Sequence, residues 1–237
     1  MNRYIALSGL CTRRKADELI KKGYIAVNGK VVRELGVKVP LDAVVTYKGM
    51  VIYPEKPFAY KIYKPRGVAG SILSPGTRKK HIGDLLPVEP TPNTISIFPL
   101  DRNMEGLSIV TNNGILIEKI MRNKHRIPQV FHVTVNKPLD ASLIEKLKKG
   151  YISSKIYFVP DDVILLENKG NRRLLSIVVS YRSYKDFQKA LRALRIPFIH
   201  IKRVEIGEIT MRGLPKPGYS HTLFKEEIAY LNFQSVR

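Results

Sequence analysis

The sequence predicts an α+β fold in two parts, a small N-terminal domain followed by a larger C-terminal one. Short runs in which apolar and polar residues alternate predict strands in both parts, and apolar residues at helical spacing predict the helices between them. A Pro-Glu-Lys-Pro stretch at residues 54–57 predicts a linker. We therefore expect domains over residues 1–53 and 60–237, joined by a linker over residues 54–59.

The positive charge of the chain is the main compositional clue to its partner. Of 237 residues, 41 are Lys or Arg and 20 are Asp or Glu, and 44% are hydrophobic, so a basic chain can still bury a core. A net charge of +21 favours an anionic partner, nucleic acid first, over a basic proteome or a membrane-surface protein. Cys11 is the one cysteine and the five histidines lack metal-ligand spacing, so we expect neither a disulfide nor a metal site.

The N-terminal stretch predicts two helices and a hairpin. Thr12 is the expected N-cap of a helix that ends at Gly23, and its apolar residues fall at helical spacing on one face. Asn28-Gly29 between two apolar runs predicts a tight hairpin turn. The cations of this helix lie off the apolar stripe or at its ends; they are Arg13, Arg14, Lys15, Lys21 and Lys22.

The run from Gly9 to Asp17, with Val27-Asn28-Gly29 further on, resembles the RNA-binding domain named after ribosomal protein S4. The resemblance implies that cations of this domain contact RNA backbone phosphates, which position the protein without reading sequence. The candidates are Arg3, Arg13, Arg14, Lys15, Lys21 and Lys22. The alternative for such a charge run is a solvated helix face.

In the larger part, Asp101 is the candidate reactive group. Alternating apolar residues predict strands over 95–99 and 107–111, so Asp101 is expected on a short loop held by sheet at both ends. A side chain in such a place is fixed by the scaffold and still reaches solvent. A lone loop aspartate is more often a simple turn residue, so its context decides its role.

That context resembles a known family. Leu100-Asp101, followed by Gly106-Leu107 and then 111–114 (Thr-Asn-Asn-Gly), is similar to the signature loop of the RsuA-like ribosomal RNA pseudouridine synthases. The resemblance implies a catalytic domain with a mixed, mainly antiparallel sheet and flanking helices. It also implies that Asp101 is the nucleophile that isomerises a uridine in structured ribosomal RNA, without metal or cofactor. Where the family has Gly-Arg before Leu-Asp, and Thr or Ser after it, this chain has Phe98-Pro99 and Met104.

The resemblance also implies two supporting groups. A family strand that reads Lys-x-Tyr-x-Val places a base-stacking ring at Phe131, although a core aromatic is an equally good interpretation of this residue. The family pairs its aspartate with a cation, for which the candidates are Arg182, Arg102 and Lys64. Lys202 and Arg203, on a strand near the end that is similar to the family's, are further RNA-binding candidates.

Other expected elements of the larger domain follow in order along the chain. They are a strand over 58–63, a helical stripe over 115–121, a strand over 129–135, a helix over 139–149, a strand over 174–180, a helix over 186–194 and a strand over 199–207.

Two functional hypotheses follow from the sequence. The first is an RNA pseudouridine synthase that acts through Asp101. The alternative is a catalytically impaired family member that acts as an rRNA-binding or ribosome-assembly protein, which is favoured by the changes at Phe98, Pro99, Met104, Phe131 and 181–183. A guanidinium or ammonium group within hydrogen-bond reach of Asp101 would favour the enzyme.

The expected partner is ribosomal RNA or a pre-ribosomal particle. No apolar run approaches the roughly 20 residues that span a bilayer, and the first residues begin a helical pattern, not a signal peptide. One cysteine fits a reducing compartment. We therefore expect a cytoplasmic monomer without membrane contact.

Overall fold

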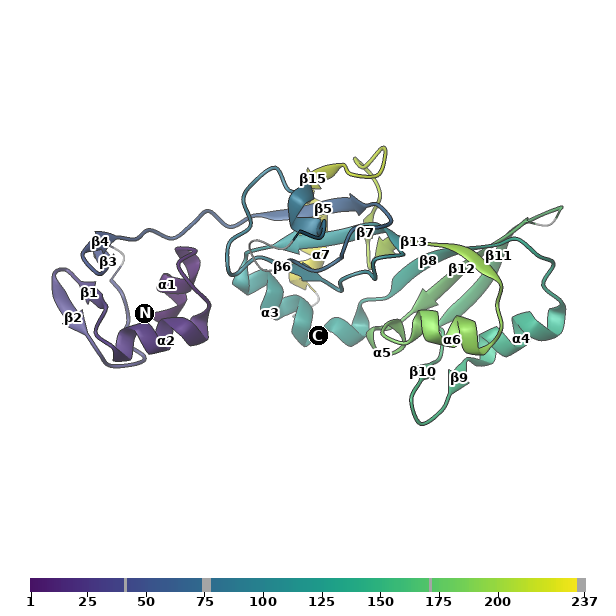
Figure 1. Cartoon of the computed structure of the whole chain (residues 1–237), viewed down its shortest axis with the longest axis horizontal. Coiled ribbons are helices and arrows are strands. Elements are labelled where there is room, and N and C mark those ends of the chain that lie inside the picture. The colour runs from purple at the N-terminus through teal and green to yellow at the C-terminus, as the bar shows by residue number, and fades with distance from the viewer. Residues whose placement is uncertain (41, 74–77, 171, 234–237) are drawn as a thin grey trace.

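The computed structural model describes residues 1–40, 42–73, 78–170 and 172–233 of the chain. A small N-terminal part lies at one end of the molecule and an extended segment leads from it into a large sheet with its helices (Figure 1). The last residues of the expected second domain, 234–237, lie outside the described part.

The N-terminal part consists of two helices and a four-stranded antiparallel sheet in the order β2-β1-β3-β4. Its elements are α1 (Asn2–Leu7), α2 (Arg13–Lys21), β1 (Ile25–Val27), β2 (Lys30–Val32), β3 (Val45–Tyr47) and β4 (Met50–Val51). As expected, the Thr12 hydroxyl caps α2 by accepting from the Lys15 backbone N–H at 3.4 Å. Ala16, Leu19 and Ile20 turn inward from α2 and form the core with Ile5, Ile25 and Val45.

The large domain is built on a sheet in the order β11-β12-β8-β13-β7-β5-β15, with β6 paired to β7 and β14 paired to β13. All pairings are antiparallel except that between β7 and β13, so the sheet is mixed and mainly antiparallel, as expected. Its strands are β5 (Ala59–Lys64), β6 (Ile95–Ile97), β7 (Glu105–Thr111), β8 (Gln129–Val135), β11 (Asp162–Lys169), β12 (Arg172–Val179), β13 (Phe198–Ile206), β14 (Ile209–Thr210) and β15 (Ser220–Thr222).

A close approach of backbones explains one glycine of this sheet. Gly106 of β7 has φ +111°, and a Cβ at this position would lie 2.1 Å from the carbonyl oxygen of Arg203 on β13. Only glycine therefore lets these two parallel strands pair beside the Asp101 loop.

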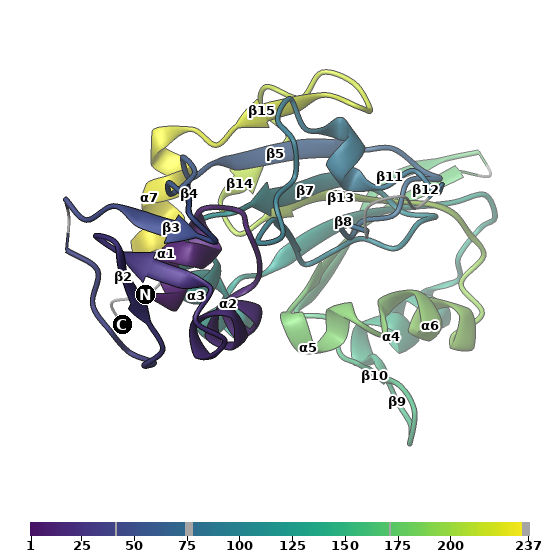
Figure 2. The same cartoon turned by 60° about the vertical axis from the view of Figure 1, so that its left-hand side comes forward.

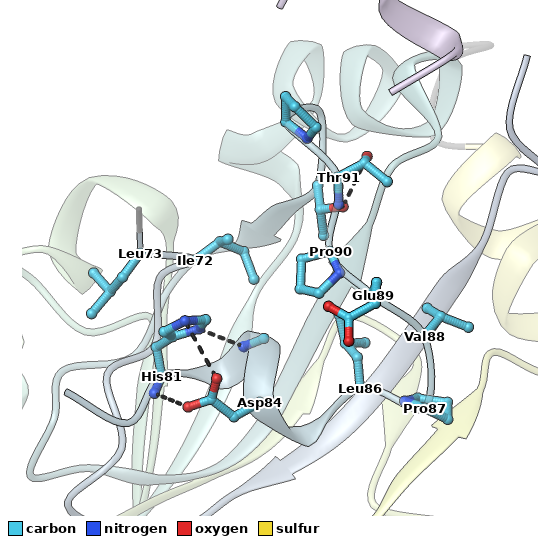
Figure 3. A pocket seen from close by; sticks show the side chains of 13 residues that line it. Ile72, Leu73, His81, Asp84, Leu86, Pro87, Val88, Glu89, Pro90 and Thr91 are labelled. Carbon is cyan, nitrogen blue, oxygen red and sulfur yellow. Dashed lines mark hydrogen bonds and ion pairs between the residues drawn. The ribbon is translucent and has the colours of Figure 1, made fainter. Parts of the chain in front are cut away.

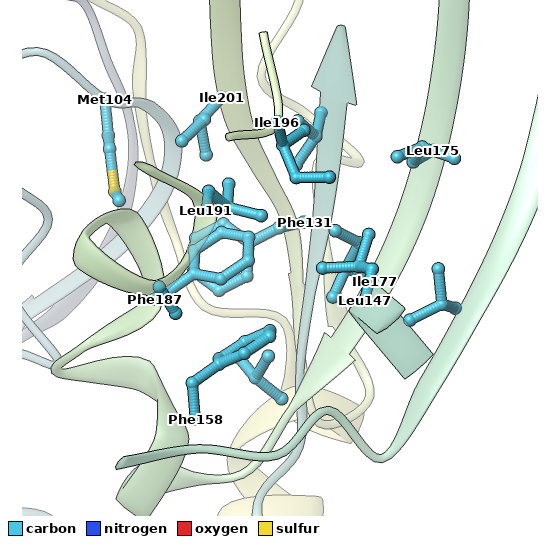
Figure 4. Close-up of a cluster of buried hydrophobic side chains, with 14 of the residues drawn as sticks. Met104, Phe131, Leu147, Phe158, Leu175, Ile177, Phe187, Leu191, Ile196 and Ile201 are labelled. Atoms are coloured by element: carbon cyan, nitrogen blue, oxygen red, sulfur yellow. The ribbon is translucent and has the colours of Figure 1, made fainter. Parts of the chain in front are cut away.

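Helices cover the sheet and close two hydrophobic cores. They are α3 (Gly114–Arg122), α4 (Ala141–Lys149), α5 (Tyr181–Tyr184), α6 (Phe187–Ala193) and α7 (Lys225–Phe233), with two short 3₁₀ helices, η1 (Ile82–Leu85) and η2 (Lys124–Arg126), and a small hairpin of β9 (Tyr151–Ile152) and β10 (Tyr157–Phe158). Figure 2 shows α4, α5 and α6 together below the sheet. One core packs α4 and α6 against β8 and β12 around Phe131 (Figure 4), and the other surrounds Phe98, Leu107 and Ile206.

The expected helices and strands of the large domain occur within a few residues of their predicted ends. The C-terminal helix α7 is an element that sequence patterning did not indicate. Its apolar residues do not form one clean stripe, since Ile228 is exposed whereas Leu231 is buried.

Candidate active site

Asp101 lies on the loop between β6 and β7, where the alternating pattern placed it, and its side chain is exposed. The loop is a closed turn in which the Met104 backbone N–H donates to the Asp101 carbonyl oxygen at 3.1 Å. The Arg102 carbonyl accepts from the Gly67 backbone N–H at 2.8 Å, which ties the loop to the end of β5. The two strands and this bond hold the Asp101 backbone in place while its carboxylate faces solvent.

Phe98, three residues before Asp101, holds a strained backbone conformation. Its φ is +47°, a left-handed value that is uncommon for a bulky residue. The strain persists because the Phe98 carbonyl accepts from the Arg203 guanidinium at 2.8 Å and from the Tyr184 hydroxyl at 3.2 Å. The same hydroxyl also bonds the Pro99 carbonyl. Arg203 and Tyr184 therefore fix the entry of the chain into the Asp101 loop.

Asp101 forms part of the wall of a pocket of about 310 Å³. The other lining residues are mostly aromatic rings and methionines; the full set is Phe98, Pro99, Asp101, Met104, Met121, Tyr181, Tyr184 and Lys185. Flat rings and polarisable sulfur atoms form a surface suited to a planar, partly apolar group such as a nucleobase. The pocket thus brings one carboxylate and one ammonium group to a base-sized space.

The predicted cation partner of Asp101 is not found at ion-pair distance. Within the described residues, no Lys, Arg or His nitrogen lies within 4.0 Å of the Asp101 carboxylate. Arg182 instead lays its guanidinium over the Tyr157 ring, 3.8 Å from the ring centre, so it faces β10. Arg102 is exposed and neither forms an ion pair nor donates a side-chain hydrogen bond to another described residue.

Lys64 is close enough to sense the charge of Asp101 without bonding to it. The side chain is fully buried, and its ammonium donates to the carbonyls of Val68 at 2.8 Å and Pro65 at 3.0 Å. Burial, together with the positive charge of Arg203, lowers the pKa of Lys64 to about 8, while Asp101 acts in the opposite direction. Lys64 therefore contributes to the electrostatic potential at Asp101 but does not contact its carboxylate.

The prediction that Phe131 stacks on a substrate base is wrong for this structure. Figure 4 shows the Phe131 ring beside Phe187 within the core. The Phe131 ring has no exposed surface, and its centre lies 4.8 Å from that of Phe187 and, in a stacked arrangement, 6.2 Å from that of Tyr184. The core interpretation is correct because β8 places Phe131 on the face that α6 covers. The ring that borders the pocket is its neighbour Tyr184. Burial raises the pKa of Tyr184 to about 12, so its hydroxyl stays a donor at neutral pH.

The prediction that Arg203 binds RNA is also wrong. Its side chain is fully buried and donates to the carbonyls of Leu107 at 2.7 Å and Phe98 at 2.8 Å and to the Gln129 side chain at 2.7 Å. Burial lowers the pKa of Arg203 to about 10. The neighbouring Lys202 is half-buried, and its ammonium lies 4.6 Å from the centre of the Tyr63 ring.

The candidate RNA contacts of the N-terminal part are all exposed: Arg3, Arg13, Arg14, Lys15, Lys21 and Lys22. Lys15 pairs with Glu18 at 2.7 Å, so its charge is partly neutralised. Arg13 and Arg14 form no ion pair with a described residue, which leaves them the better placed candidates for phosphate.

Sequence reasoning missed the pocket residues Tyr181, Tyr184 and Lys185. They stand at i, i+3 and i+4 on α5 and the residue after it, so one helix face presents all three to the pocket. This helical spacing of two tyrosines and a lysine is the sequence signal by which these pocket residues could have been found. The family resemblance pointed within this segment to Arg182, as a candidate for the family's cation one position away, and not to Tyr181, Tyr184 or Lys185.

A second pocket, of about 770 Å³, lies between η1 and residues 86–94 and shares no lining residue with the first (Figure 3). Its ionisable lining residues are His81, Asp84 and Glu89, and His81 accepts from the Gly83 backbone N–H at 3.1 Å. Its carboxylates make it unsuited to RNA phosphates. In the part of the chain that the structure describes, no group of three His, Cys, Asp or Glu side chains could hold a metal, and no helix is both long and apolar enough to cross a membrane.

A basic N-terminal module, joined to a sheet that presents an exposed carboxylate beside a base-sized pocket, defines an RNA-modifying enzyme. Comparison with known proteins supports this assignment for the N-terminal module and for the large domain. A family model described as "S4 domain" matches residues 2–45. A solved structure titled "Crystal structure of pseudouridylate synthase" shares the fold, with a TM-score of 0.63 and 19% identity over 97% of this chain and 98% of that one.

Two curated relatives establish the family. An RNA pseudouridine synthase of Aquifex aeolicus is 30% identical over 240 residues, which cover 100% of this chain and 94% of the relative. Ribosomal large subunit pseudouridine synthase B of Bacillus subtilis is 31% identical over 219 residues, which cover 90% and 88% respectively. The chain belongs to the RNA pseudouridine synthase family, and as such it is an isomerase with an N-terminal S4 domain.

Proposed function

We propose that this chain isomerises a uridine of structured ribosomal RNA to pseudouridine, with Asp101 as the nucleophile and without a cofactor. The observation that carries the proposal is the position of Asp101, whose exposed carboxylate lines a pocket of nucleobase size. The similarity to a relative named for the large ribosomal subunit supports ribosomal RNA as the substrate and makes large-subunit RNA the first to test.

The geometry suits a reaction on an extruded nucleotide. An enzyme that acts on a base within folded RNA takes that base out of its stack and holds it in a pocket. An aspartate side chain is ionised at neutral pH and can attack the nucleoside as a carboxylate. Attack at C1′ forms a bond from the ribose to Asp101 and breaks the C1′–N1 bond, so the base detaches with the bonding electron pair. The base turns, its C5 bonds to C1′ as the bond to Asp101 breaks, and C5 then loses its proton while N1 gains one. Phe98, Met104 and Tyr181 would keep the detached base between apolar surfaces while it turns.

The exposed cations of α2 would position the RNA relative to this pocket by its phosphates. We further propose that the protein acts as a cytoplasmic monomer on ribosomal RNA or a pre-ribosomal particle. Sedimentation of the free protein at micromolar concentration, and fractionation of cells that express it, test these two points. A stable dimer or a membrane-bound pool would contradict them.

The decisive experiment maps pseudouridine in both ribosomal RNAs. Cells that lack the gene are compared with the same cells complemented by the wild type, by Asp101→Asn or by Glu208→Gln, which alters an exposed carboxylate outside the pocket. We expect one or more sites to disappear without the gene, to return with the wild type and Glu208→Gln, and to stay absent with Asp101→Asn. If the deletion loses no site, the proposed activity is refuted.

One observation favours a second candidate, a catalytically impaired protein that binds rRNA or aids ribosome assembly. It is the missing ion pair of Asp101 among the described residues. For this candidate, deletion would change the sedimentation profile of ribosomal subunits without loss of any pseudouridine. Asp101→Asn would then restore the profile as well as the wild type does.

A further inference from the structure

Two lysines from different elements share one aromatic ring at the Asp101 pocket. The ammonium nitrogen of Lys124, on η2, lies 4.6 Å from the centre of the Tyr181 ring, and that of Lys185, directly after α5, lies 5.4 Å from it. Tyr181 and Lys185 line the pocket, whereas Lys124 does not. Both ammonium groups therefore lie near a ring that forms part of the pocket wall.

Among the described residues, no carboxylate lies at ion-pair distance from either ammonium group, although the charge of Asp186 acts on Lys185 from further away. Neither lysine forms an ion pair there, and Asp186, which follows Lys185 in the chain, is bound by Lys189 at 2.9 Å and by the Tyr157 backbone N–H at 3.0 Å. The face of the Tyr181 ring attracts each ammonium group, which helps to hold both in place. Two like charges near one ring repel each other, and an anion bound close to both would offset that repulsion.

An RNA phosphate is the anion that fits this position. When a base enters a pocket, its ribose and the phosphates on either side stay at the entrance. Phosphate contacts of this kind fix the position of a nucleic acid without reading its sequence. We propose that Lys124 and Lys185 bind the backbone phosphates that flank the nucleotide presented to Asp101, with the Tyr181 ring as their common support.

This inference rests on the proposed function, since it deepens the same site. One alternative role must be distinguished from phosphate binding, and it concerns Lys185. Lys185 and Asp101 line the same space, so Lys185 could instead swing to the carboxylate and serve as its counter-ion. The two roles differ in their dependence on salt. Removal of a lysine that binds one phosphate lowers the slope of log affinity against log salt concentration by roughly 0.7 to 0.9, whereas removal of an internal ion pair leaves that slope unchanged.

The test uses the full chain and in vitro transcribed large-subunit ribosomal RNA as the probe. Lys124→Gln, Lys185→Gln and the double variant are compared with the wild type, and with Lys149→Gln as a control, which alters an exposed lysine on α4 that forms no ion pair with a described residue. Lys124→Arg with Lys185→Arg tests rescue by a residue that keeps the charge. Binding is measured from 50 to 300 mM KCl in an Asp101→Asn background, and single-turnover pseudouridine formation is measured with Asp101 intact. Thermal unfolding checks the fold of each variant.

We expect the double variant to bind the RNA about tenfold more weakly at low salt, with a salt slope lower by roughly 1.5, while Lys149→Gln keeps both values and the arginine pair restores them. An unchanged salt slope for the double variant overturns the proposal. So does a loss of rate at saturating RNA from Lys185→Gln alone, with unaltered affinity, because this would assign Lys185 to Asp101. If the wild type forms no pseudouridine, the proposed function fails, but the binding slopes still test the lysines.

Discussion

At the scale of single residues, the site depends on side chains that form hydrogen bonds to the residues on either side of Asp101. Tyr184 and Arg203 both bind the Phe98 carbonyl, and Gln188 donates to the Asn103 side chain at 3.1 Å beyond Asp101. A strained residue survives only where its surroundings over-determine it, and Phe98 meets that condition. The position of the carboxylate is thus set by side chains that hold the loop backbone.

The Tyr184 hydroxyl provides the first prediction. Tyr184→Phe keeps the ring stacked on Phe131 but removes the donor to the carbonyls of Phe98 and Pro99. We expect the rate at saturating RNA to fall about tenfold, because Asp101 loses its fixed position, and the RNA affinity to stay the same. The variant should lose about 1 kcal/mol of unfolding free energy. Single-turnover assays and urea denaturation measure these quantities, with the exposed Tyr219→Phe as control; a loss of affinity alone would contradict the positioning role.

Lys64 provides a prediction about pH. Burial lowers its pKa from the ordinary 10.5 to about 8, so between these values the unfolded chain binds more protons than the folded chain. The contribution of Lys64 to the free energy of unfolding therefore rises with pH across this window, by about 2 kcal/mol between pH 7.5 and 9.5. Urea unfolding at both pH values should show a smaller rise for Lys64→Met than for the wild type. Equal rises would mean that Lys64 is not buried as a charged group.

At the scale of elements, α2 and α5 serve two parts of RNA recognition. The helix α2 uses its apolar face to build the small core and leaves Arg13 and Arg14 exposed near its N-terminal end. The short α5 turns Tyr181 and Tyr184 toward the pocket. In α2 one helix face packs and the other presents charged groups, whereas in α5 Tyr181 and Tyr184 pack against the core and border the pocket at the same time.

Replacement of Arg13 and Arg14 by Ala tests the role of α2. Both residues are exposed and outside the core, so we expect the fold to be kept and RNA binding to weaken. The slope of log affinity against log salt should flatten by roughly 1.5 if each arginine contacts one phosphate. A matched double variant, Lys225→Ala with Lys216→Ala, alters two exposed lysines of the other domain. A slope that does not differ from the wild type would argue for a solvated helix face.

At the scale of the whole molecule, an ion pair joins the beginning of the large domain to the helix α7 near its end. The Lys61 ammonium on β5 lies 2.6 Å from the Glu227 carboxylate on α7, and both side chains are buried, at 0% and 5% exposure. The first strand after the linker is thereby tied to the final helix. Separate hydrogen bonds attach the small N-terminal part to the rest of the chain. The Asn93 side chain donates to the Ala6 carbonyl, and the Glu55 backbone N–H donates to the Leu7 carbonyl.

The buried pair provides the prediction that belongs to this scale. Glu227→Ala leaves the Lys61 ammonium buried without its counter-charge, so we expect a loss of about 3 kcal/mol of unfolding free energy. Lys61→Met combined with Glu227→Leu removes both charges and should lose less than half as much. Urea unfolding of the single and double variants measures the difference. Equal losses would show that the charge pair does not govern the docking of α7.

Much of the fold follows from local patterns that can be read along the chain. The cap at Thr12, the hairpin turn at Asn28 and the strands around Asp101 each depend on a few neighbouring residues. Local pattern also placed Asp101 on an exposed loop. It failed for α7, whose apolar residues follow no single stripe. The roles that the family resemblance implied for Phe131 and Arg203 failed because their burial depends on which elements cover them, whereas the interpretation of Phe131 as a core aromatic is correct.

Spacing along the chain predicts the two-part α+β fold and the loop position of Asp101, and the motif resemblances add the RNA-binding character of the N-terminal part and the candidate role of Asp101 as nucleophile. The side chains that surround that nucleophile are selected by packing in three dimensions. Phe131 lies beneath α6 and not at the pocket, Arg203 holds backbone carbonyls, and Tyr181 meets Lys124 and Lys185 from two separate segments. The physical reason is that contacts between distant segments depend on how the helices pack on the sheet, and no local pattern encodes that packing.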